Sequence, residues 1–130
     1  MSHNDRFEKG FLNRKRVLGD SHVERSWAAA DDFNRPMQQM VTEVCWGDIW
    51  GDDTLDFRTR SLINLGMLTA MSQHHELKVH VKGALNNGVT QAEIRAVLMQ
   101  SAAYCGAPLA LAAFRIASEA INENETKNSE

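Results

Sequence analysis

Apolar residues recur at intervals of three and four along almost the whole chain, and this spacing constrains the fold more than any other feature of the sequence. On a helix such residues form one face, which must be buried against a neighbour. Only two of the 130 residues are proline, and no stretch alternates apolar and polar residues as a half-buried strand would. We therefore predict an all-α, single-domain bundle of about seven helices.

Residue patterns typical of helix starts divide the chain into these helices. Thr90 followed by Glu93 matches a capping box, in which the two side chains satisfy N–H groups of the first turn. Ser21 followed by Glu24 matches the same pattern. Pro36 fits the first turn of a further helix, where its missing N–H is not needed.

Two segments lack the helical pattern. Residues 45–57 contain two tryptophans, two glycines and several acids, and we predict a loop or short turn there. The residues from about 122 onward are polar, and we predict a frayed tail. A length of 130 residues suits one domain with a single core, so we assign residues 1–130 to one domain.

Charge and cysteine content exclude several functional classes. The net charge of −3 and the pI near 5.9 do not suit a nucleic-acid-binding protein, which needs clustered Lys and Arg. No apolar run approaches the roughly 18 residues of a membrane span, and the first residues lack an apolar signal core. We expect a cytoplasmic protein. Cys45 and Cys105 stand far apart in apolar segments, so we predict buried free thiols and no disulfide.

The stretch 73–88, QHHELKVHVKGALNNG, is the best candidate for chemistry, because three of the five histidines lie in it. On a helix Leu77 and Val81 face the core, while Glu76 and His80, four residues apart, share a neighbouring face. A carboxylate beside an imidazole raises the imidazole pKa and orients the ring, as a proton donor at neutral pH requires. The alternative is an ordinary solvated Glu–His pair.

The same histidines raise the question of a metal site. A zincin helix carries His-Glu-x-x-His, with the two ligands four residues apart on one face. Here His75 and His80 are five residues apart, which turns them away from each other. We therefore predict no metal ion.

Two arginines stand at a predicted helix start, where the helix dipole disfavours cations. Arg58 and Arg60 therefore need an acidic partner, either Asp52 or Asp53 or an anionic ligand. Arginine binds carboxylates through two parallel hydrogen bonds, which makes both residues candidates for substrate binding.

Two tryptophans, Trp46 and Trp50, lie in the predicted loop. They are equally compatible with anchoring the core and with forming a flat apolar wall for a small ligand or a subunit contact.

Several blocks together resemble one known family. The blocks GDSHVERS, WGDIW, RTRSLINLGML, E-L-x-x-H running into NNGVTQAEI, and SAAYCGAP are similar to the carboxymuconolactone decarboxylase family, over about Val17 to Ile121. In the wider alkylhydroperoxidase D-like superfamily, peroxidase members carry Cys-x-x-Cys before the histidine. This chain has Gln73 and Glu76 at those two places, so thiol peroxidase activity is not implied.

The resemblance implies an all-α, alkylhydroperoxidase D-like fold and a homo-oligomer, usually a hexamer built as a trimer of dimers. It also implies a carboxy-lyase that converts 4-carboxymuconolactone to β-ketoadipate enol-lactone in protocatechuate catabolism. In this reaction the electron pair left by CO₂ spreads through the ring to the lactone carbonyl, so no cofactor is needed. The alternative is a family member without activity, a helical binding or oligomerisation module.

The resemblance, together with the helical spacing, suggests roles for individual residues. His80 would donate a proton or polarise the lactone, and Glu76 would orient it. Residues expected to bind the lactone dicarboxylate substrate are Arg60, Arg58, Trp46, Trp50 and Tyr104.

Overall fold

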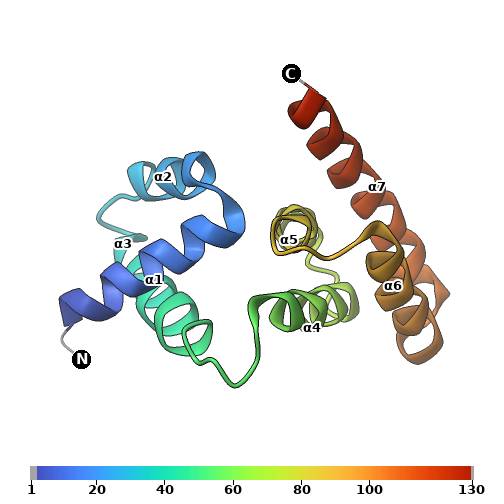
Figure 1. Cartoon of the computed structure of the whole chain (residues 1–130), viewed down its shortest axis with the longest axis horizontal. Helices are drawn as coiled ribbons and strands as arrows, with labels where there is room; N and C mark the ends of the chain where they lie inside the picture. The colour runs from blue at the N-terminus through green and yellow to red at the C-terminus, as the bar shows by residue number, and fades with distance from the viewer. Residues whose placement is uncertain (1–2, 130) are drawn as a thin grey trace. The chain divides into compact units, whose positions relative to one another are not determined.

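The computed structural model describes residues 3–129, and within this range every regular element is a helix (Figure 1). The elements are α1 (His3–Leu18), α2 (Asp20–Ala28), α3 (Arg35–Met40), the π-helix η1 (Val41–Ile49), α4 (Phe57–Ala70), α5 (His74–Asn86), α6 (Gln91–Cys105) and α7 (Ala107–Ser129). The predicted all-α class with about seven helices is confirmed. The described residues form two compact units, one ending at Phe57 and one beginning at Arg58, and each is described by itself below.

The N-terminal unit is built on a close contact between α1 and η1. A Cβ atom at Gly10 would overlap the carbonyl oxygen of Thr42, and one at Gly47 would lie 2.9 Å from the carbonyl oxygen of Arg6. Only glycine lets two helix backbones approach so closely. Gly10, an unfavourable residue inside a helix by propensity, is thus the position where α1 meets η1.

The loop predicted over residues 45–57 is confirmed for residues 50–56 and wrong for residues 45–49, where η1 continues through Ile49. Gly-Asp pairs are typical of turns, yet Gly47 is buried inside a helix against α1. Tertiary packing has overridden the local turn propensity. A π-helix of nine residues is rare, because such elements are usually single-turn bulges.

The predicted capping box at Ser21 is also wrong. Helix α2 begins at Asp20, and its N-cap is Gly19 with φ 91°, two residues before Ser21; no side chain caps it. Glu24 instead forms an ion pair of 3.1 Å with Lys15 of α1. The prediction for Pro36 is confirmed, because it lies in the first turn of α3.

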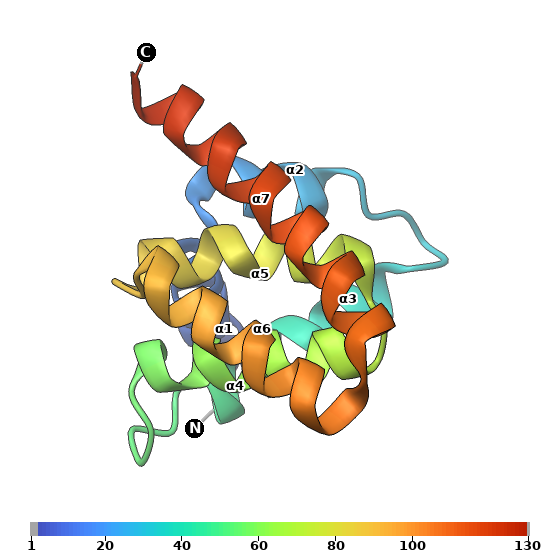
Figure 2. The ribbon, with the colours of Figure 1, turned by 90° about the vertical axis from the view of Figure 1, so that its right-hand side faces the viewer.

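In the C-terminal unit α7 packs against both α5 and α6 (Figure 2). Leucine, isoleucine, valine and alanine side chains from all four helices and the α5–α6 turn form its core. The buried members are Leu65, Leu77, Val81, Ala84, Val89, Ile94, Leu98, Ala113, Ile116, Ala117 and Ala120.

Ion pairs join the outer faces of α5 and α7. The carboxylate of Glu123 lies 2.7 Å from Lys78 Nζ and 2.6 Å from Lys82 Nζ. Hydrogen bonds from these two ammonium groups lower the pKa of Glu123 to about 2. The frayed tail predicted from about residue 122 is therefore wrong for the described residues, since α7 stays helical to Ser129. Gln91 at the start of α6 also reaches this segment, donating to Glu125 at 2.9 Å.

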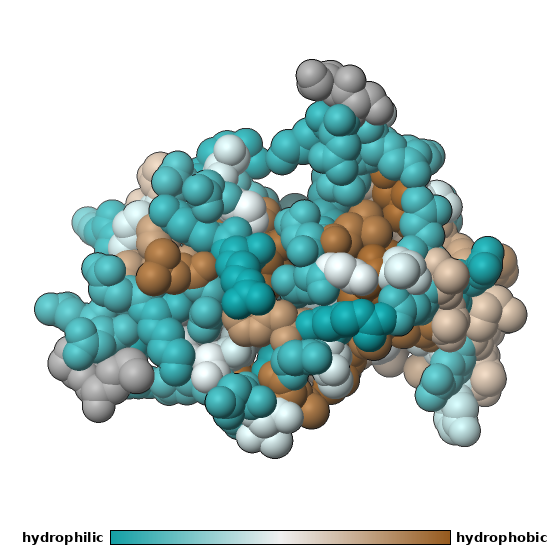
Figure 3. Space-filling view, in the orientation of Figure 1, coloured by the Kyte–Doolittle hydropathy of each residue, from teal (hydrophilic) through white to brown (hydrophobic). Residues whose placement is uncertain are grey.

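Some apolar and thiol groups remain on the surface. Hydrophobic patches interrupt the hydrophilic face in Figure 3, and Ile63 and Met67 of α4 are among the exposed apolar residues. Cys45 and Cys105 are free, as predicted, but both are exposed, so the prediction of buried thiols is wrong. None of the described helices has the length and hydrophobicity needed to cross a membrane.

Candidate active site

His80 lies in the second turn of α5 and faces α4. Its ring is half-buried, and its Nδ1 atom is 3.5 Å from the side-chain Nδ2 atom of Asn64. Sequence reasoning missed Asn64. The signal was an amide residue inside the otherwise apolar segment SLINLGML, at a position where asparagine lowers helix propensity.

Glu76 lies in the first turn of α5, one turn before His80, as the spacing predicted. Its side chain is exposed, and among the described residues it makes no hydrogen bond or ion pair with His80. The orienting role of Glu76 stays a prediction.

A second polar contact fixes α5 against α4. Asn87, directly after α5, donates from Nδ2 to the hydroxyl of Ser61 at 2.9 Å, and Ser61 is fully buried. Ser61 precedes Asn64 on α4, whereas Asn87 follows His80 on α5, so the two helices run antiparallel. The Ser61 contact therefore sets the register that brings Asn64 opposite His80.

The two arginines of the first turn of α4 have different surroundings. Arg58 forms an ion pair with Glu93 of α6, so the prediction of Asp52 or Asp53 as its partner is wrong. Glu93 also accepts a hydrogen bond from the backbone N–H of Thr90, which confirms the predicted capping box. Arg60 is half-buried with its Nε atom inside the protein, one helical turn before Asn64. Of the two arginines, Arg60 is closer in sequence to Asn64, the residue that contacts His80.

Trp46 and Trp50 belong to the core of the N-terminal unit. They are 5% and 7% exposed, and their rings stack with centroids 4.7 Å apart. Trp50 also contacts Phe57 edge to face at 5.4 Å, and Val17 packs in the same cluster. The core-anchoring interpretation is thus supported, and a role as a substrate wall stays a prediction.

The remaining candidates lie on the surface. Tyr104, near the end of α6, is 84% exposed, and its role in substrate binding stays a prediction. His74 and His75 are exposed in the first turn of α5. In the described part of the chain, no three His, Cys, Asp or Glu side chains are placed to share a metal ion.

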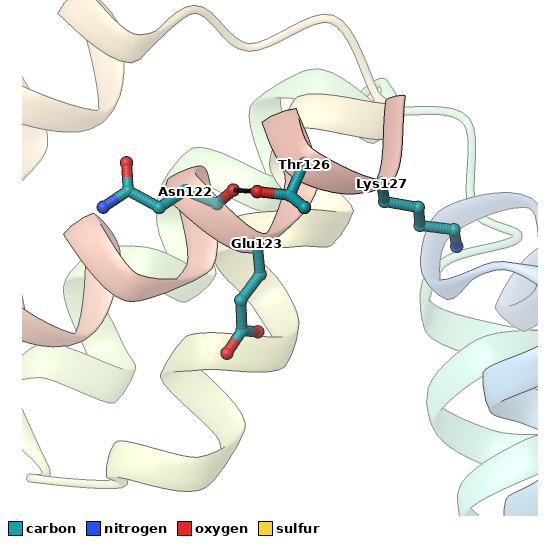
Figure 4. A pocket seen from close by; sticks show the side chains of 4 residues that line it. All are labelled: Asn122, Glu123, Thr126 and Lys127. Atoms are coloured by element: carbon teal, nitrogen blue, oxygen red, sulfur yellow. Dashed lines mark hydrogen bonds between the residues drawn. The ribbon is translucent and has the colours of Figure 1, made fainter. Parts of the chain in front are cut away.

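A surface pocket of about 390 Å³ lies away from these residues. Its lining comes from the last turns of α7 alone: Asn122, Glu123, Thr126 and Lys127. In Figure 4 these side chains point in different directions, and the one hydrogen bond drawn joins the Thr126 hydroxyl to the Asn122 carbonyl. Because one helix lines it and all four residues are exposed, this pocket lacks the enclosed polar groups of an active site.

The fold and the His80 region define an all-helical protein with a histidine-centred candidate site. Residues 35–119 match the model of the carboxymuconolactone decarboxylase family, and the chain belongs to this family.

Curated relatives differ in substrate. The chain is 40% identical to the nitrosuccinic acid decarboxylase of Metarhizium robertsii over 121 residues, which covers 93% of this chain and 85% of the relative. It is 33% identical to the 4-carboxymuconolactone decarboxylase of Acinetobacter baylyi over 123 residues, covering 95% and 92%. A 4-carboxymuconolactone decarboxylase from Pseudomonas putida is 40% identical over 48 residues, covering 37% of this chain and all of the relative. Their shared reaction supports a decarboxylase and leaves the substrate open.

Proposed function

We propose that this protein is a cofactor-independent carboxy-lyase that converts 4-carboxymuconolactone to β-ketoadipate enol-lactone in protocatechuate catabolism. The half-buried imidazole of His80, facing the Asn64 amide, is the observation that supports this proposal best. A positioned imidazole next to a polar partner is the kind of group that general acid or electrostatic catalysis requires.

The lactone itself supplies the electron sink. The bond between the ring carbon and its carboxylate breaks, CO₂ leaves, and the electron pair moves through the ring double bond onto the carbonyl oxygen. A proton then adds to the carbon next to the carbonyl, giving the enol-lactone. The protein must hold the second carboxylate, stabilise the charge on the carbonyl oxygen and exclude bulk water.

We assign these tasks to residues of the C-terminal unit. His80 acts on the lactone, as proton donor or as polariser of the carbonyl, and Glu76 orients it. Arg60 is the main carboxylate-binding candidate, because it stands one turn from Asn64 on the same face of α4. Arg58 is the second such candidate, and in the described structure it is ion-paired with Glu93. Tyr104 completes the proposed substrate-binding set of this unit.

Nitrosuccinate is a second candidate substrate, because the relative with this activity is 40% identical over nearly the whole chain. The two compounds share one chemical pattern. In each, the carbon that loses CO₂ also carries a CH₂-carboxylate arm and a group whose oxygen atoms accept the electron pair. A site that binds the arm and stabilises a negatively charged oxygen would suit both.

The test is a decarboxylation assay of the purified protein on each freshly prepared compound. CO₂ release is measured for both, and loss of ultraviolet absorbance is followed for the conjugated lactone. We expect turnover of the lactone, and a His80→Gln variant with unchanged circular dichroism should lose at least tenfold in kcat. Activity within threefold of wild type in this variant would contradict the role of His80.

The two substrates separate the proposals. Turnover of nitrosuccinate alone would replace the lactone as substrate while keeping the reaction class. No CO₂ release from either compound by folded protein would favour the non-catalytic helical module.

We further propose that the chain assembles as a homo-oligomer, with a trimer of dimers as the expected form. The exposed apolar side chains of α4 support this, because isolated chains rarely leave neighbouring apolar groups on one helix face in water. Light scattering coupled to size-exclusion chromatography measures the mass directly. A monomer at micromolar concentration would refute the proposal.

A further inference from the structure

The contact between Asn64 and His80 bears on a question that the proposed function leaves open, namely whether His80 donates a proton or only a hydrogen bond. Nδ2 of an asparagine amide is a donor and cannot accept a hydrogen bond. A ring nitrogen that receives this donor must carry a lone pair. A hydrogen bond donated by Asn64 Nδ2 across the 3.5 Å contact thus requires an unprotonated Nδ1, which places the proton of a neutral His80 ring on Nε2.

We propose that Asn64 is a positioning residue that keeps His80 in the neutral tautomer with its proton on Nε2. His80 then acts as a hydrogen-bond donor to the negatively charged sink oxygen. The proton that replaces CO₂ comes from water, which is left as hydroxide. The imidazole therefore keeps the same protonation state throughout the reaction. A neutral imidazole used to polarise a carbonyl is a known catalytic device. This inference rests on the proposed function for its catalytic meaning.

The register between α4 and α5 supports a specific contact between Asn64 and His80. The bond from Asn87 to the buried Ser61 hydroxyl has an ordinary length of 2.9 Å and holds α5 against α4. Asn64 is one turn of α4 away from Ser61, and His80 is two turns of α5 away from Asn87, so each faces the other in the same seam. The 3.5 Å distance between Asn64 and His80 is long for a hydrogen bond, as catalytic contacts often are before substrate binds.

The charges around His80 act in opposite directions. Arg60, on the Asn64 face of α4, disfavours a second positive charge on the ring, and so does the Asn64 donor. Glu76, one turn earlier on α5, favours the charged ring, but its carboxylate is exposed and therefore screened by water. On α7, Glu123 pairs with Lys78 and Lys82, and Glu119 pairs with Lys78. These lysines are two residues before and after His80, hence on roughly the opposite face of α5.

Nitrogen NMR of the full-length protein with ¹⁵N-labelled histidine tests the proposal without substrate. Long-range proton–nitrogen correlations identify the protonated ring nitrogen, and the His80→Gln variant assigns the signal. We expect wild-type His80 at pH 7.5 to be neutral with its proton on Nε2. A ring protonated on Nδ1, or on both nitrogens, would overturn the proposal whatever the activity.

Two substitutions separate a positioning role from a structural one. Asn64→Asp keeps the shape but offers only acceptors, so the proton should move to Nδ1 or the ring should become doubly protonated. Asn64→Leu removes the donor and should leave a mixture of the two tautomers. Asn122→Asp, on the exposed end of α7, is the matched control for charge and should leave the His80 signals unchanged. Unchanged His80 signals in both folded Asn64 variants would overturn the proposal.

Kinetics link the tautomer to the reaction. With the active substrate, Asn64→Asp should lower kcat at least tenfold, because the ring loses the donor that fixes its tautomer. KM should rise as well, because the new carboxylate stands one turn from Arg60. A kcat within threefold of wild type would refute the catalytic meaning. If the Asn64 variants shift the tautomer as expected but the protein decarboxylates neither compound, the proposed function is wrong and the positioning role of Asn64 is still supported.

Discussion

Replacing Gly10 by alanine tests whether the α1–η1 contact organises the N-terminal unit. In a free helix this change stabilises by about 1 kcal/mol, because alanine loses less backbone entropy than glycine. Here the new methyl group would overlap the carbonyl oxygen of Thr42, which belongs to a helix backbone and cannot rotate away. The two helices would have to separate by on the order of 1 Å, which forfeits a quarter to a half of the dispersion energy across the contact. We expect a net loss of about 2 kcal/mol or more.

The chain offers both a probe and a matched control for this experiment. All three tryptophans, Trp27, Trp46 and Trp50, lie in the N-terminal unit, so tryptophan fluorescence during urea or thermal unfolding reports on that unit. The midpoint for Gly10→Ala should fall by roughly 5–15 °C. Gly66→Ala on α4 is the control, because its methyl group would only touch Val97 at 3.9 Å, and it should be neutral or slightly stabilising. If Gly10→Ala proves as stable as wild type, the inferred contact is wrong.

Three further changes probe the C-terminal unit. Glu123→Gln removes a carboxylate whose pKa is lowered to about 2. The stabilising effect of this carboxylate should be complete above pH 5 and disappear as the pH falls towards 2. The urea midpoints of variant and wild type should therefore converge in acid. A difference between the two midpoints that stays constant with pH would contradict the ion pairing. Thr90→Ala should cost about 1 kcal/mol in urea unfolding while Thr90→Ser costs little, and equal losses would exclude a capping role. Arg60→Lys should raise KM for the substrate severalfold in steady-state assays, because lysine lacks the two-pronged guanidinium; an unchanged KM would remove Arg60 from the site.

Local sequence patterns correctly predicted those features that depend only on residues adjacent in sequence. The Thr90 capping box and Pro36 in the first turn of α3 both depend on residues within one turn, and both predictions are confirmed. Ser21 matched the capping pattern equally well, but the N-cap of α2 is Gly19, with φ 91°, two residues before Ser21, which therefore lies inside the helix. A local motif therefore predicts a cap only where no stronger backbone feature stands beside it.

Tertiary packing explains the failures. The π-helix η1 could not be foreseen, because Gly47 resembles a turn residue until α1 is known to pack on it. For the candidate site, helical spacing gave the separation of Glu76 and His80. Asn64 comes from another helix, and its contact with His80 depends on the register between α4 and α5. This register cannot be predicted from a single sequence.

Glu93 links the beginnings of two helices. One carboxylate closes the first turn of α6 at Thr90 and also neutralises Arg58 in the first turn of α4. Removing this carboxylate would therefore lose the bond to the Thr90 N–H and the ion pair with Arg58 together, whereas removing the Arg58 guanidinium would lose the ion pair alone. A substitution at position 93 must consequently be tolerated by the first turns of two helices at once.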